Sequence, residues 1–540
     1  MLSRAISSPG NALVNAVLCG LLALVFAFKF YCAVIGYPGS WCDEVICIEP
    51  AVHFTDTGSY AAPGIARQLA VRGMPGTDHA AYSYVPLGSY ARIPIFYLIG
   101  DDLRARRIAD CCLLVLATLS LFLVLKPWCS RLACLFGVNL FILHSMLTDN
   151  VGRPDNLSLA LGLLAFAAWQ RQSGTTSLWA VVGMGFLVGL SGLAHQFGCV
   201  FWGSLIVVAK LAQEGWTMDW RMLVRWLFWY GVGGLAGTVL PWLPQVALDP
   251  GTWWQQYAFG ITHKFLLGRN FWVSFWVLAA DAVQNPVLFL ILPAGLWFLW
   301  LNTARRGRLL AVAAWLAVVI VWRCWSFEPS NPWYFVHFWA LLCLMASLSI
   351  DRLLAGNASQ PSGKTSTWLV YAEVVAALLV GLRAQCWPAG EVFFQSAARI
   401  HVDDVRLLQA NVTKQECVLA APQFYFDVPS TNKCLWMWCD QLDLNQFDVV
   451  VGTFQTKQQV QVVSSSDQWG DSLTPTQASI FMTNFELVAA SSLPTNQHRT
   501  GLEKYLRWAA AADLLHIPSS IHGCYIYRNR HSKNQGVAAQ

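Results

Sequence analysis

Long apolar runs alternate with short polar connections over the first 386 residues of the chain. Runs of about 20 residues recur, which is the length an α-helix needs to cross the hydrocarbon core of a bilayer. The first run is too long for a signal peptide and lacks a small-residue cleavage site, so we expect it to be retained. We predict about eleven spans, at 12–36, 107–126, 132–147, 157–169, 178–193, 197–211, 226–247, 286–301, 309–325, 333–350 and 368–386.

Two of the connections between the runs are long, at 37–106 and 249–285. Residues 48–73 of the first connection form amphipathic pieces that are too polar to span, and we expect them at the membrane interface. A short apolar helix is predicted at about 87–99. The second connection is rich in Trp and Tyr, which favour the boundary between water and lipid. Both connections are therefore expected to lie along one face of the membrane.

The pattern changes after residue 386. Residues 387–540 have the size of one small domain. A helical stretch at 391–408 precedes β-like runs, and helical spacing returns at 501–515. The β-like runs are 417–421, 447–453, 486–491 and 524–528. Because helices and strands alternate, we expect a C-terminal α/β domain that follows a membrane module at 1–386.

Composition and charge agree with this division. Hydrophobic residues make up 56% of the chain and charged residues only 12%, whereas soluble domains carry about 25% charged residues. The fold class is therefore a polytopic α-helical membrane protein with a C-terminal α/β domain. Lys and Arg gather in alternate short connections, which the positive-inside rule assigns to the cytoplasm. The N-terminus is then inside, and both long connections and the C-terminal domain are outside. No basic patch of the kind that binds nucleic acid is present.

The 16 cysteines do not form an evident framework, because many lie inside apolar runs. Cys434 and Cys439 fall in the C-terminal domain and are candidates for a disulfide if that compartment is oxidising. The sequence does not assign partners. No tight Cys/His cluster typical of a metal site accompanies them.

Two adjacent carboxylates, Asp43 and Glu44, follow the first span. In isolation they read as solvated charges that mark the end of a helix. However, a long semi-apolar outer connection follows them. A carboxylate beside a membrane cleft can take a proton from an attacking hydroxyl or amine, and such general-base help is worth about 10²–10⁴-fold in rate. We therefore treat both as candidate catalytic residues.

A second group of candidates includes Arg153 and Asp155, in the turn between the third and fourth spans. They are equally well explained as residues that mark the start of a helix, since a carboxylate such as that of Asp155 is favoured at a helix N-terminus. As functional residues, Arg153 would bind phosphate through its planar fork of donors, beside a second acid. The other candidates for contact with an anionic lipid headgroup are predicted at the outer face: His195, His263, Lys264, Arg269, Tyr334 and His337.

Several short motifs together resemble the GT-C membrane glycosyltransferases. More narrowly, they resemble the bacterial relatives of protein O-mannosyltransferases and of lipid A aminoarabinose transferases. The resemblance covers about residues 12–350. Its motifs are the Asp43-Glu44 pair, Ala51-Val52-His53-Phe54 with Gly58, Tyr82-Ser83-Tyr84-Val85-Pro86, Gly100 with Arg104 to Arg107, Gly152-Arg153-Pro154-Asp155, and Trp333-Tyr334 with His337.

The resemblance implies an inverting glycosyltransferase in a bacterial inner membrane. Its donor would be a sugar on a polyprenyl phosphate, and transfer would occur at the outer face. Asp43 matches the first acid of the family's pair and would be the base, with Asp155 as a second acid. Tyr82 and Tyr84 would bind substrate, while Arg153 and the cations of 249–285 would hold the phosphate. The cofactor is unknown, because some members use a divalent metal and the sequence shows no dense carboxylate cluster. The sugar and the acceptor, whether protein, lipid or glycan, stay open.

Two other functions compete with this one. The chain could be a transporter or flippase with a fused outer domain, since ionisable residues within spans often mark a transport path. Against this, few such residues are evident beyond Lys29, and there are no paired half-repeats of the kind many transporters have. Alternatively, it could be a non-catalytic assembly protein in which the C-terminal domain binds a partner.

Overall fold

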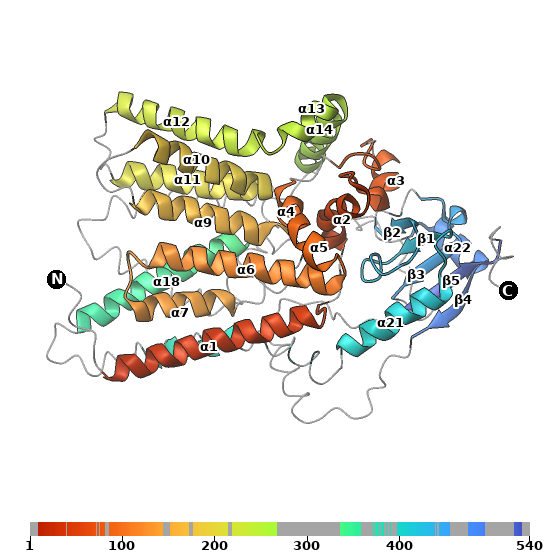
Figure 1. Cartoon of the computed structure of the whole chain (residues 1–540), viewed down its shortest axis with the longest axis horizontal. Helices are drawn as coiled ribbons and strands as arrows, with labels where there is room; N and C mark the ends of the chain where they lie inside the picture. The colour runs from red at the N-terminus through yellow and green to blue at the C-terminus, as the bar shows by residue number, and fades with distance from the viewer. Residues whose placement is uncertain are drawn as a thin grey trace.

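The structure is a computed structural model that describes residues 9–266, 335–357, 397–453, 473–491 and 523–531, apart from short gaps, and scattered positions between 371 and 392. A helical bundle forms one part and a small sheet domain the other (Figure 1). The helices α2 to α5 lie between the two parts. The chain is thus mostly helical, with a small sheet domain near its C-terminus.

The described helices of the bundle agree with the predicted spans. They are α1 (Pro9–Val34), α6 (Leu103–Leu125), α7 (Arg131–Ile142), α9 (Asp155–Arg171), α10 (Leu178–Ala194), α11 (Gln196–Gln213), α12 (Trp220–Val239) and α18 (Phe335–Asn357). Among described residues, two helical segments are both long and apolar enough to cross a membrane, Ala12–Val34 and Leu103–Leu125, and several other helices are shorter and apolar. The predicted spans 286–301 and 309–325, and nearly half of the positions of 368–386, lie outside the described residues. The count of eleven stays a prediction.

Close backbone contact joins α10 to α12. A Cβ built at Gly185 would lie 2.0 Å from the carbonyl oxygen of Tyr230, and one at Gly189 would lie 2.1 Å from that of Gly234. Glycine is required at these positions because any side chain would separate the two backbones. Such small-residue contacts are typical of helices that associate in a membrane.

Five shorter helices lie at the end of the bundle that faces the sheet domain. They are α2 (Cys42–Thr57), α3 (Pro63–Val71), α4 (Leu87–Tyr90), α5 (Ile93–Ile99) and α13 (Leu243–Leu248), after which comes the longer α14 (Pro250–Leu266). Gln256 of α14 donates to the backbone oxygen of Ala80 at 2.8 Å. The two long connections predicted to share one face therefore meet at one end of the bundle (Figure 1).

The sheet domain has five strands in the order β2-β1-β3-β5-β4. Strands β2, β1 and β3 are parallel, whereas β5 and β4 join antiparallel. All four predicted strands are present, and helix α21 (Ala397–Asn411) agrees with the stretch predicted at 391–408. The strands are β1 (Cys417–Ala420), β2 (Asn432–Leu435), β3 (Val449–Gly452), β4 (Phe485–Ala490) and β5 (Tyr525–Asn529). The helix predicted at 501–515 lies outside the described residues.

The sheet buries both of its faces, because alternate residues of β1 and β3 enter different apolar clusters. Val418 and Val449 face the side that includes α21 residue Leu408, and Leu419 faces the side that includes Phe481 of α22 (Pro475–Asn484). The sequence offers Cys434 and Cys439 as candidates for a disulfide, but no disulfide joins them in the structure. The two side chains instead pack within the second of these apolar clusters.

Helices α2 and α3 dock the sheet domain onto the bundle. The apolar side chains Ile65 and Leu69 of α3 pack into the same cluster as the sheet, and Gln68 donates to the backbone oxygen of Leu435 at 2.7 Å. We predicted that this segment lies at the membrane interface. That placement stays a prediction. The apolar side chains of α3 pack against the C-terminal domain, which supplies burial that an amphipathic pattern requires.

A buried carboxyl group, Glu49 of α2, lies at the centre of this junction. It accepts hydrogen bonds from the hydroxyl of Tyr425 and from the backbone N–H of Gly64, the latter at 2.9 Å. Its side chain is almost wholly buried. Burial raises the pKa of Glu49 from 4.5 to about 7, although both hydrogen bonds act in the opposite direction. Docking of the domain is therefore sensitive to the protonation of this residue.

We predict that the stability of the protein falls as the pH rises from about 5 to 8. The folded state binds the Glu49 proton more tightly than the unfolded state, so raising the pH between the two pKa values favours unfolding. The loss is on the order of 2–3 kcal/mol. Glu49→Gln should flatten this dependence in thermal unfolding of the detergent-purified protein. Tyr425→Phe, which removes a hydrogen bond to the charged form, should extend it to higher pH. An unchanged slope in Glu49→Gln would contradict the assignment.

Candidate active site

The two adjacent acids predicted to follow the first span occupy the first turn of α2. A helix N-terminus carries partial positive charge and favours carboxylates in its first turn. Their side chains nevertheless have different surroundings. Asp43 is 27% exposed, whereas Glu44 is completely buried. Neighbouring residues on a helix point about 100° apart, so only one of the two can face the open side.

Glu44 is held by two arginines of α6. Arg107 donates to both carboxylate oxygens, at 2.8 and 2.7 Å, and Nε of Arg106 lies 3.4 Å from Oε1. All three side chains are at most 2% exposed. A buried carboxylate is tolerated when it is paired in this bidentate geometry. The contact fixes the start of α2 against α6.

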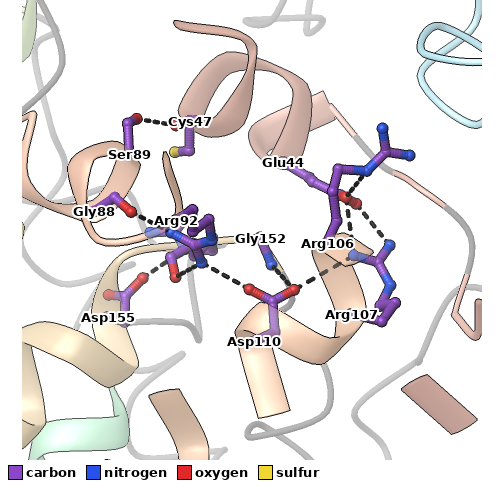
Figure 2. A network of polar contacts seen from close by, with 11 residues as sticks. Glu44, Cys47, Gly88, Ser89, Arg92, Arg106, Arg107, Asp110, Gly152 and Asp155 are labelled. Atoms are coloured by element: carbon purple, nitrogen blue, oxygen red, sulfur yellow. Dashed lines mark hydrogen bonds and ion pairs between the residues drawn. The ribbon is translucent and has the colours of Figure 1, made fainter. Parts of the chain in front are cut away.

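A second carboxylate, Asp110, extends this network toward the turn at residue 152 (Figure 2). It accepts from Arg92 at 2.7 Å, from the backbone N–H of Gly152 at 2.9 Å and from Arg107 at 3.4 Å. Arg92 also donates to the backbone oxygens of Gly88 and Arg153, at 2.7 and 3.0 Å. Residues from α4, α5, α6 and the turn before α9 are therefore joined through two arginines and one carboxylate.

Gly152 allows this turn to approach α2. Its φ is +77°, and a Cβ at this position would lie 2.3 Å from Cγ of Glu44. Glycine is thus required for two reasons, the left-handed backbone and the close contact. The turn that carries Arg153 is consequently fixed directly against the buried member of the acidic pair.

Arg153 connects the two other carboxylates. Its Nε donates to Asp155 at 2.8 Å, and its Nη1 donates to Asp43. Arg153 is nearly buried and Asp155 completely buried. Among the described residues of this network, four arginines face four carboxylates, so the formal charges of these eight side chains cancel. Asp43 is the most exposed of these acids, and it lies at the opening of the network.

Two histidines of the helical bundle affect the Asp155 carboxylate. His195 and His337 both interact electrostatically with it. His337 is completely buried in α18, and the indole N–H of Trp202 donates to its Nδ1 at 3.0 Å. The rings of Phe197 and Phe201 lie 5.3 and 5.8 Å from the imidazole. The structure thus joins three of the predicted residues by direct contacts, Asp43, Arg153 and Asp155, and His195 and His337 interact electrostatically with Asp155.

The remaining predicted residues are not placed in this site. Tyr82, Tyr84, Arg269 and Tyr334 lie outside the described residues. His263 and Lys264 belong to α14, but their side chains are not described. Their roles stay predictions. Glu44 is adjacent to the site, but its oxygens face Arg106 and Arg107.

Sequence reasoning missed Arg92 and Asp110. Asp110 carries a usable signal, because an ionisable residue eight positions into an apolar helix is costly unless it is paired. Arg92 lies in a short polar break between α4 and α5 and has no such signal. Within the described part of the chain, no group of three or more His, Cys, Asp or Glu side chains is arranged to hold a metal ion.

Comparison with known proteins places this geometry in a fold. No protein-family model and no curated sequence matches the chain. Among solved structures, ArnT from Cupriavidus metallidurans bound to undecaprenyl phosphate superposes with a TM-score of 0.52 and 13% identity, covering 78% of this chain and 86% of ArnT. The apo state of the same protein gives a TM-score of 0.51 and 16% identity, covering 75% and 82%. The chain has the GT-C fold. That fold belongs to polytopic membrane enzymes, which agrees with the resemblance found in the sequence.

We predict that Gly152→Ala disrupts this part of the GT-C fold more than Gly58→Ala does. Gly58 has nearly the same φ, +76°, but nothing lies within 4 Å of a Cβ there. Gly58→Ala therefore measures the backbone cost alone, about 1 kcal/mol. Gly152→Ala adds the clash with Glu44, for a further 1–3 kcal/mol. Thermal unfolding of both variants in one detergent tests this, and equal losses would contradict the close contact.

We predict that Glu44→Gln destabilises the protein by about 3–5 kcal/mol, because it removes the carboxylate that pairs the buried Arg106 and leaves Arg107 with the more distant Asp110 alone among its ion-pair partners in the described network. Glu486→Gln is the matched control. Its partner Arg530 is 56% exposed and Glu486 is 47% exposed, so the same substitution should cost less than about 1 kcal/mol. Denaturant unfolding measures both. Similar costs would show that the buried network is not a stabilising frame.

Proposed function

We propose that the protein is an inverting glycosyltransferase that moves a sugar from a polyprenyl-phosphate donor to an acceptor at the outer face of the membrane. The observation that carries the proposal is the Asp43–Arg153–Asp155 arrangement, in which a partly exposed carboxylate is held at the opening of a buried ionic network in a GT-C fold. An ArnT with this fold has been solved with undecaprenyl phosphate, which supports a lipid-linked donor.

Asp43 is the general base of this proposal. It takes the proton from the acceptor hydroxyl or amine while that group attacks the anomeric carbon, and the polyprenyl phosphate leaves from the opposite side. Arg153 and Asp155 hold Asp43 in position. We assign Glu44 a positioning role instead of the catalytic role expected from the sequence, because both of its oxygens are engaged by Arg107 and its side chain is completely buried.

The phosphate needs positive charge from outside the network. A phosphate leaving group is already charged, so its departure depends on cationic stabilisation. The charges of the four described arginines and four described carboxylates of the network, Asp43 included, cancel, and Arg153 is already bonded to two of the carboxylates. We therefore assign phosphate binding chiefly to the second long connection, with His263, Lys264 and Arg269. Gln256 of α14, in that connection, donates to the backbone oxygen of Ala80 in the first long connection. The contact brings the two long connections close to each other.

We predict that Asp43→Asn lowers release of undecaprenyl phosphate from a panel of undecaprenyl-phosphate sugars by at least about 100-fold, as expected for loss of a general base. The purified full-length protein is mixed with the panel and candidate acceptors, and lipid phosphate is quantified. Asp219→Asn is the control, because Asn caps α12 as well as Asp does.

Release that is unchanged by Asp43→Asn would refute the assignment of the base. Absence of both release and donor binding in the wild type would refute the transferase itself. In that case, uptake of the same lipids into vesicles without a covalent product would point to a transporter.

A further inference from the structure

The loop that follows β1, residues 421–428, reaches from the sheet domain to the helical bundle. Two neighbouring aromatic residues of this loop contact different parts of the bundle. The hydroxyl of Tyr425 is bonded to Glu49 of α2, whereas Phe426 packs against both the apolar cluster that includes Val418 of the sheet and a separate cluster of the bundle. The second cluster is formed by residues of α2, α5 and α6: Ile48, Ala51, Phe96, Ala105 and Ala109.

Arg106 of α6 connects the ring of Phe426 to the ionic network of the site. Its guanidinium carbon, Cζ, lies 4.0 Å from the centroid of that ring, well inside the limit of about 6 Å for a cation–π interaction. The same side chain places Nε 3.4 Å from Oε1 of Glu44 (Figure 2). Arg106 is 1% exposed, and a cation–π interaction is strongest where water is excluded. One guanidinium therefore touches both the sheet domain and the carboxylate at the start of α2.

Glu44 alone does not fix the orientation of Arg106. Arg107 makes two short hydrogen bonds to Glu44, but Nε of Arg106 is buried without a hydrogen-bond partner among the described residues. The other nitrogens of Arg106 donate to the hydroxyl of Ser40 at 3.2 Å and to the backbone oxygen of Asp101 at 3.4 Å, at or beyond the long end of the usual range. A planar guanidinium that is held at its edge by long contacts still needs a surface against its face, and an aromatic ring provides one.

We propose that Phe426 is a positioning residue that the sheet domain contributes to the active site. Its ring holds Arg106 against Glu44. Glu44 in turn lies directly against the turn at Gly152, where an added Cβ would be 2.3 Å from its Cγ, and that turn leads to Arg153, the partner of the proposed base. The effect on catalysis rests on the proposed function, whereas the effect on the geometry of α2 does not.

The geometric role is tested by hydrogen exchange, measured by mass spectrometry on the full-length protein in lipid nanodiscs. Phe426→Leu removes the ring but keeps an apolar side chain, and Phe426→Tyr keeps the ring. Phe424→Leu is the matched control, because Phe424 lies in the same loop, is 3% exposed and packs in the cluster of the sheet.

We expect Phe426→Leu to speed exchange in the peptide that spans residues 42–48 by about tenfold, the order expected for loss of a desolvated cation–π interaction. Phe426→Tyr and Phe424→Leu should stay close to wild type in this peptide. Unchanged exchange in Phe426→Leu would overturn the proposal, and so would an equal increase in Phe424→Leu.

A double-mutant cycle shows whether the ring acts through the guanidinium. Arg106→Met keeps most of the apolar stem of the side chain and removes its charge. In the Arg106→Met background, Phe426→Leu should add little further exchange in the same peptide, because the two substitutions remove one interaction. Additive effects would show that the ring only packs, and the proposal would then be wrong.

The consequence for catalysis is tested by steady-state release of undecaprenyl phosphate from a sugar-bearing donor. Phe426→Leu should lower kcat by about tenfold and leave KM for the donor within about twofold, as expected for a change at the base that does not touch the bound lipid. Phe426→Tyr should restore kcat, and Phe424→Leu should leave it unchanged. An active wild type with an unchanged kcat in Phe426→Leu would overturn the role of Phe426 in positioning the base.

Failure of the proposed function has a different signature. A wild type that releases no lipid phosphate from any donor would refute the transferase. The exchange measurements would still decide whether Phe426 holds Arg106 and the start of α2 in place.

Discussion

The bidentate ion pair between Glu44 and Arg107 is the contact on which the site depends. Both groups are buried, so neither tolerates loss of the other. Because Glu44 is fixed against α6, the turn at Gly152 can lie directly against its side chain. That turn determines where Arg153 and Asp155 point. The position of the partly exposed carboxylate, Asp43, therefore depends on the Glu44–Arg107 pair, in which Asp43 takes no part.

The two members of the acidic pair illustrate how position on one helix separates the structural role of Glu44 from the catalytic role proposed for Asp43. Glu44 faces α6, is completely buried and is paired with two arginines, whereas Asp43 is 27% exposed and is paired with Arg153. A carboxylate that holds the frame must be fully paired. One that acts on a substrate must retain access to solvent. The same two-residue motif meets both demands because consecutive helical side chains diverge.

Much of this arrangement could be predicted from residue patterns. The hydrophobic periodicity predicted the described bundle helices and four strands, and a resemblance in short motifs predicted the GT-C fold. The pattern missed β2, because two of its four residues, Asn432 and Lys433, are polar. It also missed α22, although Thr474 and Gln477 form a capping box that is readable from sequence. The role of Arg92 could not be predicted from the sequence, because it depends on contacts with Asp110 and Arg153, which are distant along the chain.

Helix α2 links the site to the C-terminal domain. Asp43 lies in its first turn and Glu49 lies six residues later, about 9 Å along the axis. Glu49 is bonded to Tyr425 of the sheet domain, so one continuous helix carries the proposed base at one point and the docking contact at another. A shift of the sheet domain would move α2 and be resisted by the Glu44–Arg107 pair. The buried ion pair therefore fixes the start of α2 through α6, separately from the docking contact that Glu49 makes with the sheet domain.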